Sequence, residues 1–254
     1  MKKQFNLIYF GFFLIFFSCG SVSEFEEEIY NGEIVIINDT IINTHNSDDR
    51  KEADFKILSL GGSYTIGQSV CEKCRFPAQL VDSLLEETAN KNTFDLKIIA
   101  RTGWTTSNLI DAIDLENITS DYNFVTLLIG VNNQYQNKSF SVYEAEFPFL
   151  VNRAISFVNG DPRKLVVLSI PDYAFTPFGN GNTAISDGVK KYNDFAKFYC
   201  NQRNITFLNI TDITQQGLTY PILVANDGLH PSKEAYSKFV ERLLPLAFEK
   251  LMLR

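Results

Sequence analysis

Ser63 is the residue best placed to do chemistry, because it lies in a glycine-rich turn, Gly61-Gly62-Ser63, between an apolar stretch and a helical pattern. A hydroxyl on such a strand-to-helix turn projects into a cleft, and the amino terminus of the following helix favours developing negative charge. A serine becomes a nucleophile when a neighbouring base takes its proton. Ser63 is therefore a candidate nucleophile for acyl transfer.

The base for Ser63 comes from a small set, since the chain of 254 residues holds only two histidines, His45 and His230. Asp227 precedes His230 by three positions and is placed to reach one imidazole nitrogen while the other faces the serine. A carboxylate in this position holds the reactive tautomer of the imidazole. We expect Ser63, Asp227 and His230 to form a catalytic triad in that chain order.

Hydrogen-bond donors for a developing oxyanion follow three of the apolar stretches. They are the amide of Ser63, the amide of Gly103 and the side chain of Asn132. Three donors aimed at one point stabilise the negative charge of a tetrahedral intermediate. We therefore expect Ser63, Gly103 and Asn132 to form an oxyanion hole.

Short apolar runs alternate with amphipathic stretches from position 54 onward, which is the pattern of a parallel sheet with helical crossovers. The predicted strands cover residues 55–60, 96–100, 124–129, 165–170 and 205–210, and the predicted helices cover residues 76–88, 106–113, 142–158, 184–202 and 232–251. This order predicts a three-layer α/β/α fold of the flavodoxin-like type with a five-stranded parallel sheet. Ligands bind beyond the carboxyl ends of strands in such sheets, where the candidate segments lie.

The loop around Ser63 also comes close to a nucleotide-binding P-loop. Gln68 stands where that motif needs a lysine, and the third strand ends at Leu128-Ile129-Gly130 without an acidic residue for Mg²⁺. The net charge of −7 disfavours a polyanion such as DNA, and two histidines cannot build a His-rich metal site. We expect no nucleic acid partner, no metal and no cofactor.

The amino terminus has the features of an export signal. Lys2 and Lys3 precede an apolar run, residues 7–17, that is too short to span a bilayer permanently. The following Ser18-Cys19 pair resembles the cleavage site of a bacterial lipoprotein, whose cysteine is acylated; an ordinary cleavage site is the alternative. The expected organisation is a signal peptide (1–18), a lipidated Cys19 with an acidic tether (19–53) and one folded domain (54–254).

Three further cysteines follow Cys19. Cys71 and Cys74 have the spacing of a local disulfide in an oxidising compartment and of a redox motif in a reducing one. A zinc site would need two more ligands, and Cys200 lies in a helical pattern, where a buried apolar role is typical. We therefore expect a disulfide between Cys71 and Cys74 after export.

Four segments together resemble the SGNH, or GDSL-type, family of serine esterases and hydrolases, over roughly residues 54–252. They are the nucleophile block Leu60-Gly61-Gly62-Ser63, the glycine block at Gly103, the block Gly130-Val131-Asn132 and the closing block Asp227-Gly228-Leu229-His230. The resemblance implies that Ser63 is the nucleophile and that Gly103 and Asn132 complete the oxyanion hole. It also implies that Asp227 and His230 complete the triad.

The sequence departs from this family pattern at two places. Gly62 stands where an aspartate usually precedes the nucleophile, and Asn133 stands where an aspartate usually follows Asn132. Neither departure removes an atom of the triad or of the oxyanion hole. The segment 171–182 and Trp104 remain open between a role in the substrate pocket and a role in the core.

The resemblance and the export signal together predict an exported ester hydrolase, lipid-anchored to a bacterial membrane, that acts through an acyl-enzyme and faces the periplasm or the cell surface. O-acyl esters of glycans are the expected substrates, and lysophospholipids or other small acyl esters are the alternative. A surface ligand-binding lipoprotein without turnover competes with this hypothesis, as does a thiol oxidoreductase that uses Cys71 and Cys74.

Overall fold

The computed structural model describes residues 29–30, 33–34 and 53–252 of the chain. Its contacts divide the chain into two units, Met1–Lys51 and Glu52–Arg254. In the first unit, β1 (Ile29–Tyr30) pairs antiparallel with β2 (Glu33–Ile34). The predicted signal peptide and Cys19 lie outside the described residues. Among the helices that are described, none has the length and apolar character needed to cross a membrane.

The second unit is built around a five-stranded sheet in which all strands run parallel. Its strands are β3 (Asp54–Gly61), β4 (Thr93–Ala100), β5 (Phe124–Leu128), β6 (Leu165–Leu168) and β7 (Thr206–Leu208). Counted in sequence, the spatial order β4-β3-β5-β6-β7 is the 2-1-3-4-5 order of flavodoxin-like folds. The predicted sheet is confirmed, although β6 and β7 each end two residues before the apolar runs do.

The strands β5 and β6 consist entirely of buried residues, which explains their apolar sequences. A parallel sheet covered by helices on both faces has no exposed side on which polar residues can alternate. Thr126 of β5 satisfies its buried hydroxyl by donating to Ser59 Oγ of β3 at 2.9 Å. The core of the domain therefore lies on both faces of the sheet.

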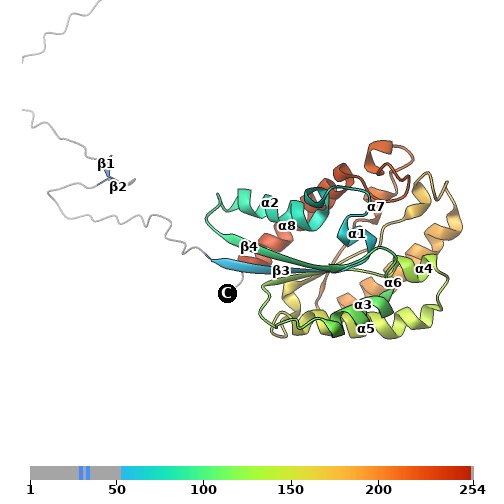
Figure 1. The fold of residues 1–254 in the computed structure, drawn as a ribbon, viewed down its shortest axis with the longest axis horizontal. Coiled ribbons are helices and arrows are strands. Elements are labelled where there is room, and N and C mark those ends of the chain that lie inside the picture. The colour runs from blue at the N-terminus through green and yellow to red at the C-terminus, as the bar shows by residue number, and fades with distance from the viewer. Residues whose placement is uncertain (1–28, 31–32, 35–52, 253–254) are drawn as a thin grey trace, which may run out of the picture. The chain divides into compact units, whose positions relative to one another are not determined.

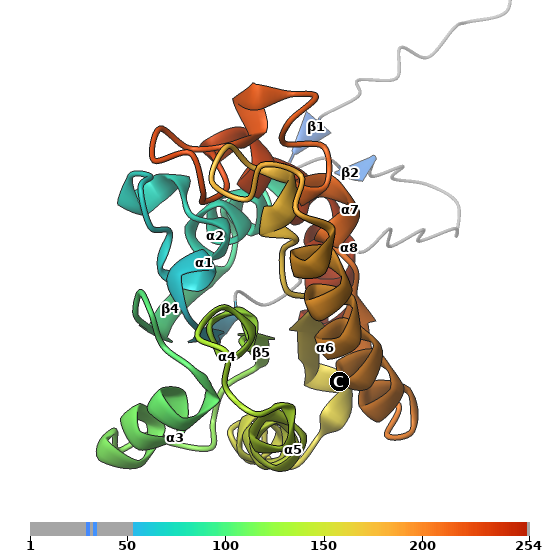
Figure 2. The ribbon, with the colours of Figure 1, turned by 90° about the vertical axis from the view of Figure 1, so that its right-hand side faces the viewer.

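Long helices cover the two faces of the sheet. They are α2 (Phe76–Glu87), α3 (Thr106–Leu115), α5 (Phe140–Ser156), α6 (Thr183–Asn201) and α8 (Lys233–Met252). Figure 1 shows α2 and α8 on one face and α3 and α5 on the other, and Figure 2 shows the same layers from the end. The helix α2 contacts α8, and α5 contacts both α3 and α6. The predicted three-layer arrangement is confirmed.

Local sequence signals mark the starts of these helices. Thr105 caps α3 in a capping box, in which its side chain and that of Asn108 each accept the other's backbone N–H. Pro77 occupies the first turn of α2, where its missing N–H is tolerated. Ser232 Oγ accepts the backbone N–H of Ala235 at 3.2 Å where α8 begins. The helices therefore start close to the predicted positions.

Two short helices that the sequence pattern does not predict begin where β3 and β5 end. They are α1 (Ser63–Ile66) and α4 (Val131–Tyr135), of four and five residues. Segments this short cannot show a helical period of apolar residues. The other short helices are α7 (Thr211–Thr214) and the 3₁₀ helices η1 (Glu72–Cys74), η2 (Pro162–Lys164), η3 (Tyr173–Phe175) and η4 (Pro221–Leu223).

In this strand order a ligand-binding crevice is expected outside the carboxyl ends of β3 and β5. In a 2-1-3-4-5 sheet the chain proceeds in opposite directions from the first and third strands, and the crevice opens outside their carboxyl ends. Those two strands are β3 and β5 here, and the segments that follow them carry Ser63 and Asn132. The fold thus brings two of the candidate residues to the same edge of the sheet.

Gly61 allows α1 to pack closely against the end of β5. A Cβ atom at this position would lie 2.1 Å from Thr65 Oγ1 and 2.5 Å from the carbonyl oxygen of Leu128. At the neighbouring Gly62, the nearest atom to an added Cβ is the carbonyl oxygen of Trp104, at an ordinary 3.5 Å. Only the first of the two glycines is therefore required by packing.

We expect Gly61→Ala to lower the free energy of unfolding by about 3 kcal/mol, because the Leu128 backbone cannot rotate away from the new methyl group. Gly62→Ala is the matched control and should change it by less than about 1 kcal/mol. Urea unfolding followed by circular dichroism measures both values. Equal losses in the two variants would contradict the close packing between α1 and β5.

Candidate active site

Asp227 and His230 form a hydrogen-bonded pair at the start of the segment that leads into α8. His230 Nδ1 lies 2.6 Å from Asp227 Oδ2, and Asp227 Oδ1 accepts the backbone N–H groups of Leu229 and His230 at 3.0 Å each. The three-residue spacing therefore closes a tight turn around the carboxylate. This geometry fixes which imidazole nitrogen faces the carboxylate and leaves Nε2 for other chemistry.

The environment of Asp227 keeps its carboxylate charged. Burial by itself raises the pKa of Asp227, but hydrogen bonds from Ser69, from His230 and from the Leu229 amide outweigh that effect and hold the pKa well below its usual range. A charged carboxylate is the form that orients an imidazole and stabilises it when it gains a proton. Asp227 thus has the electrostatic state that the triad hypothesis requires.

Four predicted site residues line one pocket at the carboxyl edge of the sheet. Ser63, Gly103, Asn132 and His230 border a cavity of about 180 Å³, with Tyr64 also in its wall. Ser63 is the first residue of α1 and is almost fully buried. Within residues 53–252 no hydrogen bond joins its hydroxyl to His230, a contact that often tightens only when substrate binds. The structure therefore gathers these residues around one space.

Gly103 lies at a turn whose backbone requires a glycine. The N–H of Trp104 donates to the carbonyl of Arg101 at 3.3 Å, and Gly103 has a φ of +84°, as the third residue of a type II turn does. Gln136 Nε2 donates to the Gly103 carbonyl at 2.9 Å and ties this turn to the end of α4. The turn is thereby held at the edge of the pocket.

Asn132 has one of its amide hydrogens fixed by the protein. Asn132 Nδ2 donates to the carbonyl of Trp104 at 3.0 Å, which sets the plane of the side-chain amide. A primary amide carries two N–H donors, so one remains for another acceptor. Gly130 begins this loop at a φ of +123°, and a Cβ there would lie 2.6 Å from the Tyr143 ring. The loop thus brings the amide to the pocket beside a tightly packed aromatic ring.

Asn133, one of the two departures from the family pattern, braces the site from inside the core. It is fully buried; its Oδ1 accepts the Thr106 amide at 2.9 Å, and its Nδ2 donates to the Thr106 hydroxyl at 2.6 Å. That hydroxyl in turn donates to the Glu146 carboxylate, so it needs a donor as its second partner. An ionised aspartate has no proton to donate, whereas asparagine meets both requirements of Thr106.

Three side chains near the pocket were not predicted from the sequence. Ser69 Oγ donates to Asp227 Oδ2 at 2.6 Å, and Thr102 Oγ1 donates to Gln68 Oε1 at 2.5 Å. Tyr135 of α4 lines the pocket. The partners of the two hydrogen bonds lie 158 and 34 residues apart, and no local pattern in the sequence indicates such contacts.

Part of the 171–182 segment forms a wall of the pocket. Tyr173 lines it, and the rings of Tyr135, Tyr173 and Phe178 form a cluster with centroids 6.0 to 6.3 Å apart. Phe178 is 52% exposed and Tyr135 is 50% exposed, so these two rings face solvent beside the cavity, whereas Tyr173 is buried. Trp104, in contrast, packs against the hydrophobic core. The segment therefore contributes to the pocket through Tyr173, which also belongs to the core, whereas Trp104 contributes to the core.

The structure joins Cys71 and Cys74 in a disulfide at the turn before α2. Cys200 is a free thiol on α6, and burial raises its pKa to about 12, so it remains protonated. Within the described part of the chain, no group of three His, Cys, Asp or Glu side chains is arranged to hold a metal ion.

Solved structures with the same fold include several hydrolases. The chain is similar to Axe2, an acetylxylan esterase from Geobacillus stearothermophilus (18% identity, TM-score 0.59, 80% of this chain and 96% of that chain). It is also similar to a lipase/acylhydrolase from Enterococcus faecalis (19% identity, TM-score 0.57, 79% and 97%). A third is LAE5, an alpha/beta hydrolase from the Lake Arreo metagenome in Spain (17% identity, TM-score 0.60, 78% and 96%). At these identities the likeness shows the fold alone. No curated protein matches the chain.

A sequence model of one protein family matches residues 59–238, from within β3 to the first turns of α8. The matched region contains all the segments that line the pocket. It covers more than half of the chain and agrees with the resemblance that the four sequence blocks indicate. The chain therefore belongs to the GDSL-like lipase/acylhydrolase family.

Proposed function

We propose that this member of the family is an exported serine esterase that works through an acyl-enzyme on Ser63. The observation that carries the proposal is the pairing of His230 with a charged Asp227 beside a pocket that Ser63 also lines. A nucleophile, a base and a group that orients the base are the minimum set for acyl transfer by serine. A binding protein without turnover would not need this pairing.

In this mechanism the Ser63 hydroxyl attacks the ester carbonyl while His230 Nε2 takes its proton. The negative charge on the carbonyl oxygen is stabilised by the amides of Ser63 and Gly103 and by the free N–H of Asn132. His230 then gives its proton to the leaving alcohol, and an acyl-enzyme remains. Water, deprotonated by His230, attacks that ester and releases the acid and the free serine.

The pocket favours a short acyl group attached to a sugar. A cavity of about 180 Å³ accommodates a small acyl chain, and the exposed rings of Tyr135 and Phe178 offer apolar faces beside it. Aromatic faces pack well against the C–H surface of a sugar ring. An acetylxylan esterase among the similar structures supports this substrate class. O-acyl esters of glycans are therefore our first candidate.

An esterase of lysophospholipids or other small acyl lipids is the second candidate. The observation that favours it is the apolar character of the same rim, formed by Tyr135, Tyr173 and Phe178. A series of p-nitrophenyl esters from acetate to dodecanoate separates the two candidates. A maximum of kcat/KM at acetate favours the glycan ester, and a maximum at eight or more carbons favours the lipid.

Removal of the triad should abolish most of the activity. We expect Ser63→Ala and His230→Ala each to lower kcat for p-nitrophenyl acetate by about 10³-fold or more, because the triad acts as a unit. Asn132→Ala should lower kcat by about 10²-fold with little change in KM, since an oxyanion donor acts mainly in the transition state.

The matched control for these variants is His45→Ala, which removes the only other histidine and should retain full activity. Labelling by a fluorophosphonate should occur in wild type and be lost in Ser63→Ala. Full activity in Ser63→Ala or His230→Ala would show that the triad is wrongly assigned. Absence of any turnover and of labelling in the wild type would favour the binding-protein hypothesis.

The exposed ring of Phe178 provides a test of the sugar-binding rim. We expect Phe178→Ala to raise KM for an acetylated xylo-oligosaccharide by about fivefold, because one aromatic contact is lost, and to leave kcat/KM for p-nitrophenyl acetate within about twofold. Phe198→Ala on α6 is the control, since Phe198 is 65% exposed and, unlike Phe178, does not pack against the pocket-lining rings of Tyr135 and Tyr173. An unchanged KM in Phe178→Ala would argue against a sugar at this rim.

We also propose that the protein is anchored to a bacterial membrane through acylated Cys19 and faces an oxidising compartment. The lipoprotein-like segment at Ser18-Cys19 supports the anchor, and the disulfide between Cys71 and Cys74 supports the compartment, since disulfides persist outside the reducing cytosol. Two or three acyl chains hold a protein stably at a membrane, whereas one chain binds only marginally.

Cys19→Ser should release the protein from the membrane fraction, because the variant has no thiol to acylate. Cell fractionation together with incorporation of labelled palmitate measures this loss. Ser21→Ala is the control and should remain in the membrane fraction and labelled. Wild-type protein that appears in the soluble fraction without detergent would contradict the anchor.

A further inference from the structure

The carboxylate of Asp227 receives a second side-chain donor that the triad itself does not include. Ser69 Oγ donates to Asp227 Oδ2 at 2.6 Å, the same oxygen that binds His230 Nδ1 at 2.6 Å. Within residues 53–252, Ser69 and His230 are the two side chains that donate to this carboxylate. Ser69 follows the candidate nucleophile by six residues. One short segment therefore carries Ser63 at its start and contacts Asp227 at its end.

The backbone at Ser69 has an unfavourable conformation for a serine. Its φ is +68°, in the left-handed region where a residue with a Cβ pays free energy that glycine does not. The turn before it is closed by Gly67, which caps α1, and by a bond of 3.2 Å from the Val70 N–H to the Gly67 carbonyl. This strained turn aims the hydroxyl of Ser69 at Asp227.

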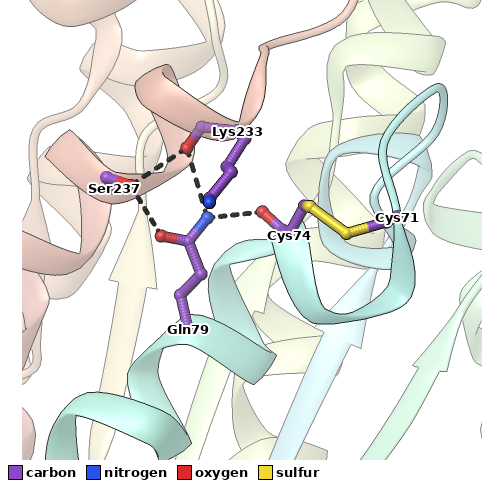
Figure 3. The surroundings of a disulfide bond; sticks show 5 residues. All are labelled: Cys71, Cys74, Gln79, Lys233 and Ser237. Carbon is purple, nitrogen blue, oxygen red and sulfur yellow. Dashed lines mark hydrogen bonds between the residues drawn. A yellow bond between two sulfur atoms is a disulfide. The ribbon is translucent and has the colours of Figure 1, made fainter.

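The disulfide closes the next turn and connects it to α8. Cys74 N–H donates to the Cys71 carbonyl at 2.8 Å, and Gln79 Nε2 donates to the Cys74 carbonyl at 2.5 Å and to the Lys233 carbonyl at 3.2 Å. Ser237 Oγ donates to Gln79 Oε1 at 2.7 Å (Figure 3). Lys233 is the first residue of α8 and follows His230 by three positions. The Ser69 loop and the Asp227–His230 segment are therefore tied to the same helix end.

We propose that Ser69 is a positioning residue for the Asp227–His230 pair and that the disulfide-closed turn, through Gln79, holds Ser69 in place. This inference rests on the proposed triad. Ser69 does not line the pocket, so its hydroxyl acts on the reaction through the orientation of Asp227 and, through it, of His230. Loss of the hydroxyl lets the carboxylate turn away and lowers kcat without changing how substrate binds.

The other ionisable groups that face His230 do not compete with Ser69 for this role. The ring of Tyr64 lies 5.4 Å from the imidazole, and burial raises the pKa of Tyr64 far enough to keep it neutral. Asp172 and Tyr173 border a small space beside His230, and the Asp172 carboxylate accepts from the Ala174 amide and from Gln215. None of these groups bonds to Asp227.

The decisive variant is Ser69→Gly, because it removes the hydroxyl and at the same time relieves the backbone strain. We expect unchanged or higher Tm, a fall in kcat of about fivefold and a KM within about twofold; fivefold corresponds to about 1 kcal/mol of barrier. The effect is moderate because Ser69 is exposed and water replaces part of its hydrogen bond. Ser69→Asn tolerates the positive φ, carries an N–H donor and should recover part of kcat.

Asn159→Gly is the matched control, since Asn159 is exposed, has a φ of +54° and lies between α5 and β6, at the opposite edge of the sheet. It should leave kcat unchanged. The double variant Cys71→Ser with Cys74→Ser should also lower kcat, and adding Ser69→Gly to it should lower kcat no further than Ser69→Gly alone does. If the cysteine substitutions and Ser69→Gly each lower kcat by their full factor in the combined variant, the link between the disulfide and Ser69 is overturned.

A measurement without turnover tests Ser69 independently of the esterase proposal. In a His45→Gln background, His230 is the only histidine, so the NMR signal of its Nδ1–H proton, which lies far downfield when the proton is shared with Asp227, can be assigned directly. Ser69→Gly should move this signal upfield, because a carboxylate that turns away makes a longer and weaker hydrogen bond to the imidazole.

The outcomes separate the two proposals. Wild type inactive on every ester, with a shifted Nδ1–H signal in Ser69→Gly, would refute the esterase and support the positioning role. Wild type active and Ser63→Ala inactive, with the kcat and the Nδ1–H signal of Ser69→Gly equal to those of the wild type, would overturn the positioning role alone.

Discussion

The parallel pairing of β3 with β5 is the constraint on which the site depends. Gly61 is paired with Leu128, so the two strands end at the same level of the sheet. A short helix follows each of them. Ser63 follows Gly61 by two residues and Asn132 follows Leu128 by four, which brings nucleophile and amide donor to one edge. A side chain at Gly61 would push α1 away from that edge.

The sheet and its covering helices were predictable because burial leaves a regular trace in the sequence. A strand such as β5 is buried on both faces and therefore reads as an unbroken apolar run. The short helices α1 and α4 leave no such trace, because their form is set by the strand ends and by tight glycine contacts. The contact between Ser69 and Asp227 joins residues 158 positions apart, and only the folded chain reveals it.

The two departures from the family pattern have different physical meanings. Asn133 lies in a buried chain of hydrogen bonds through Thr106 to Glu146. Its position in this chain needs one acceptor and one donor, and a side-chain amide supplies both. Gly62 lies at the start of α1 with a φ of −116°, which any residue adopts, and an added Cβ would make ordinary contacts. The first departure is therefore demanded by its neighbours, whereas the second is permitted by them.

Asp227 links the chemistry of the site to the stability of the loop that carries it. Its folded pKa lies below its unfolded value, so its hydrogen bonds stabilise the fold above the unfolded pKa and are lost as pH falls through the folded one. Across the neutral range the carboxylate keeps its charge, and with it the bonds to Ser69, Leu229 and His230. One oxygen of this carboxylate, Oδ1, holds the turn closed, and the other, Oδ2, fixes the imidazole. Protonation of Asp227 at low pH therefore loosens the turn and frees the imidazole together.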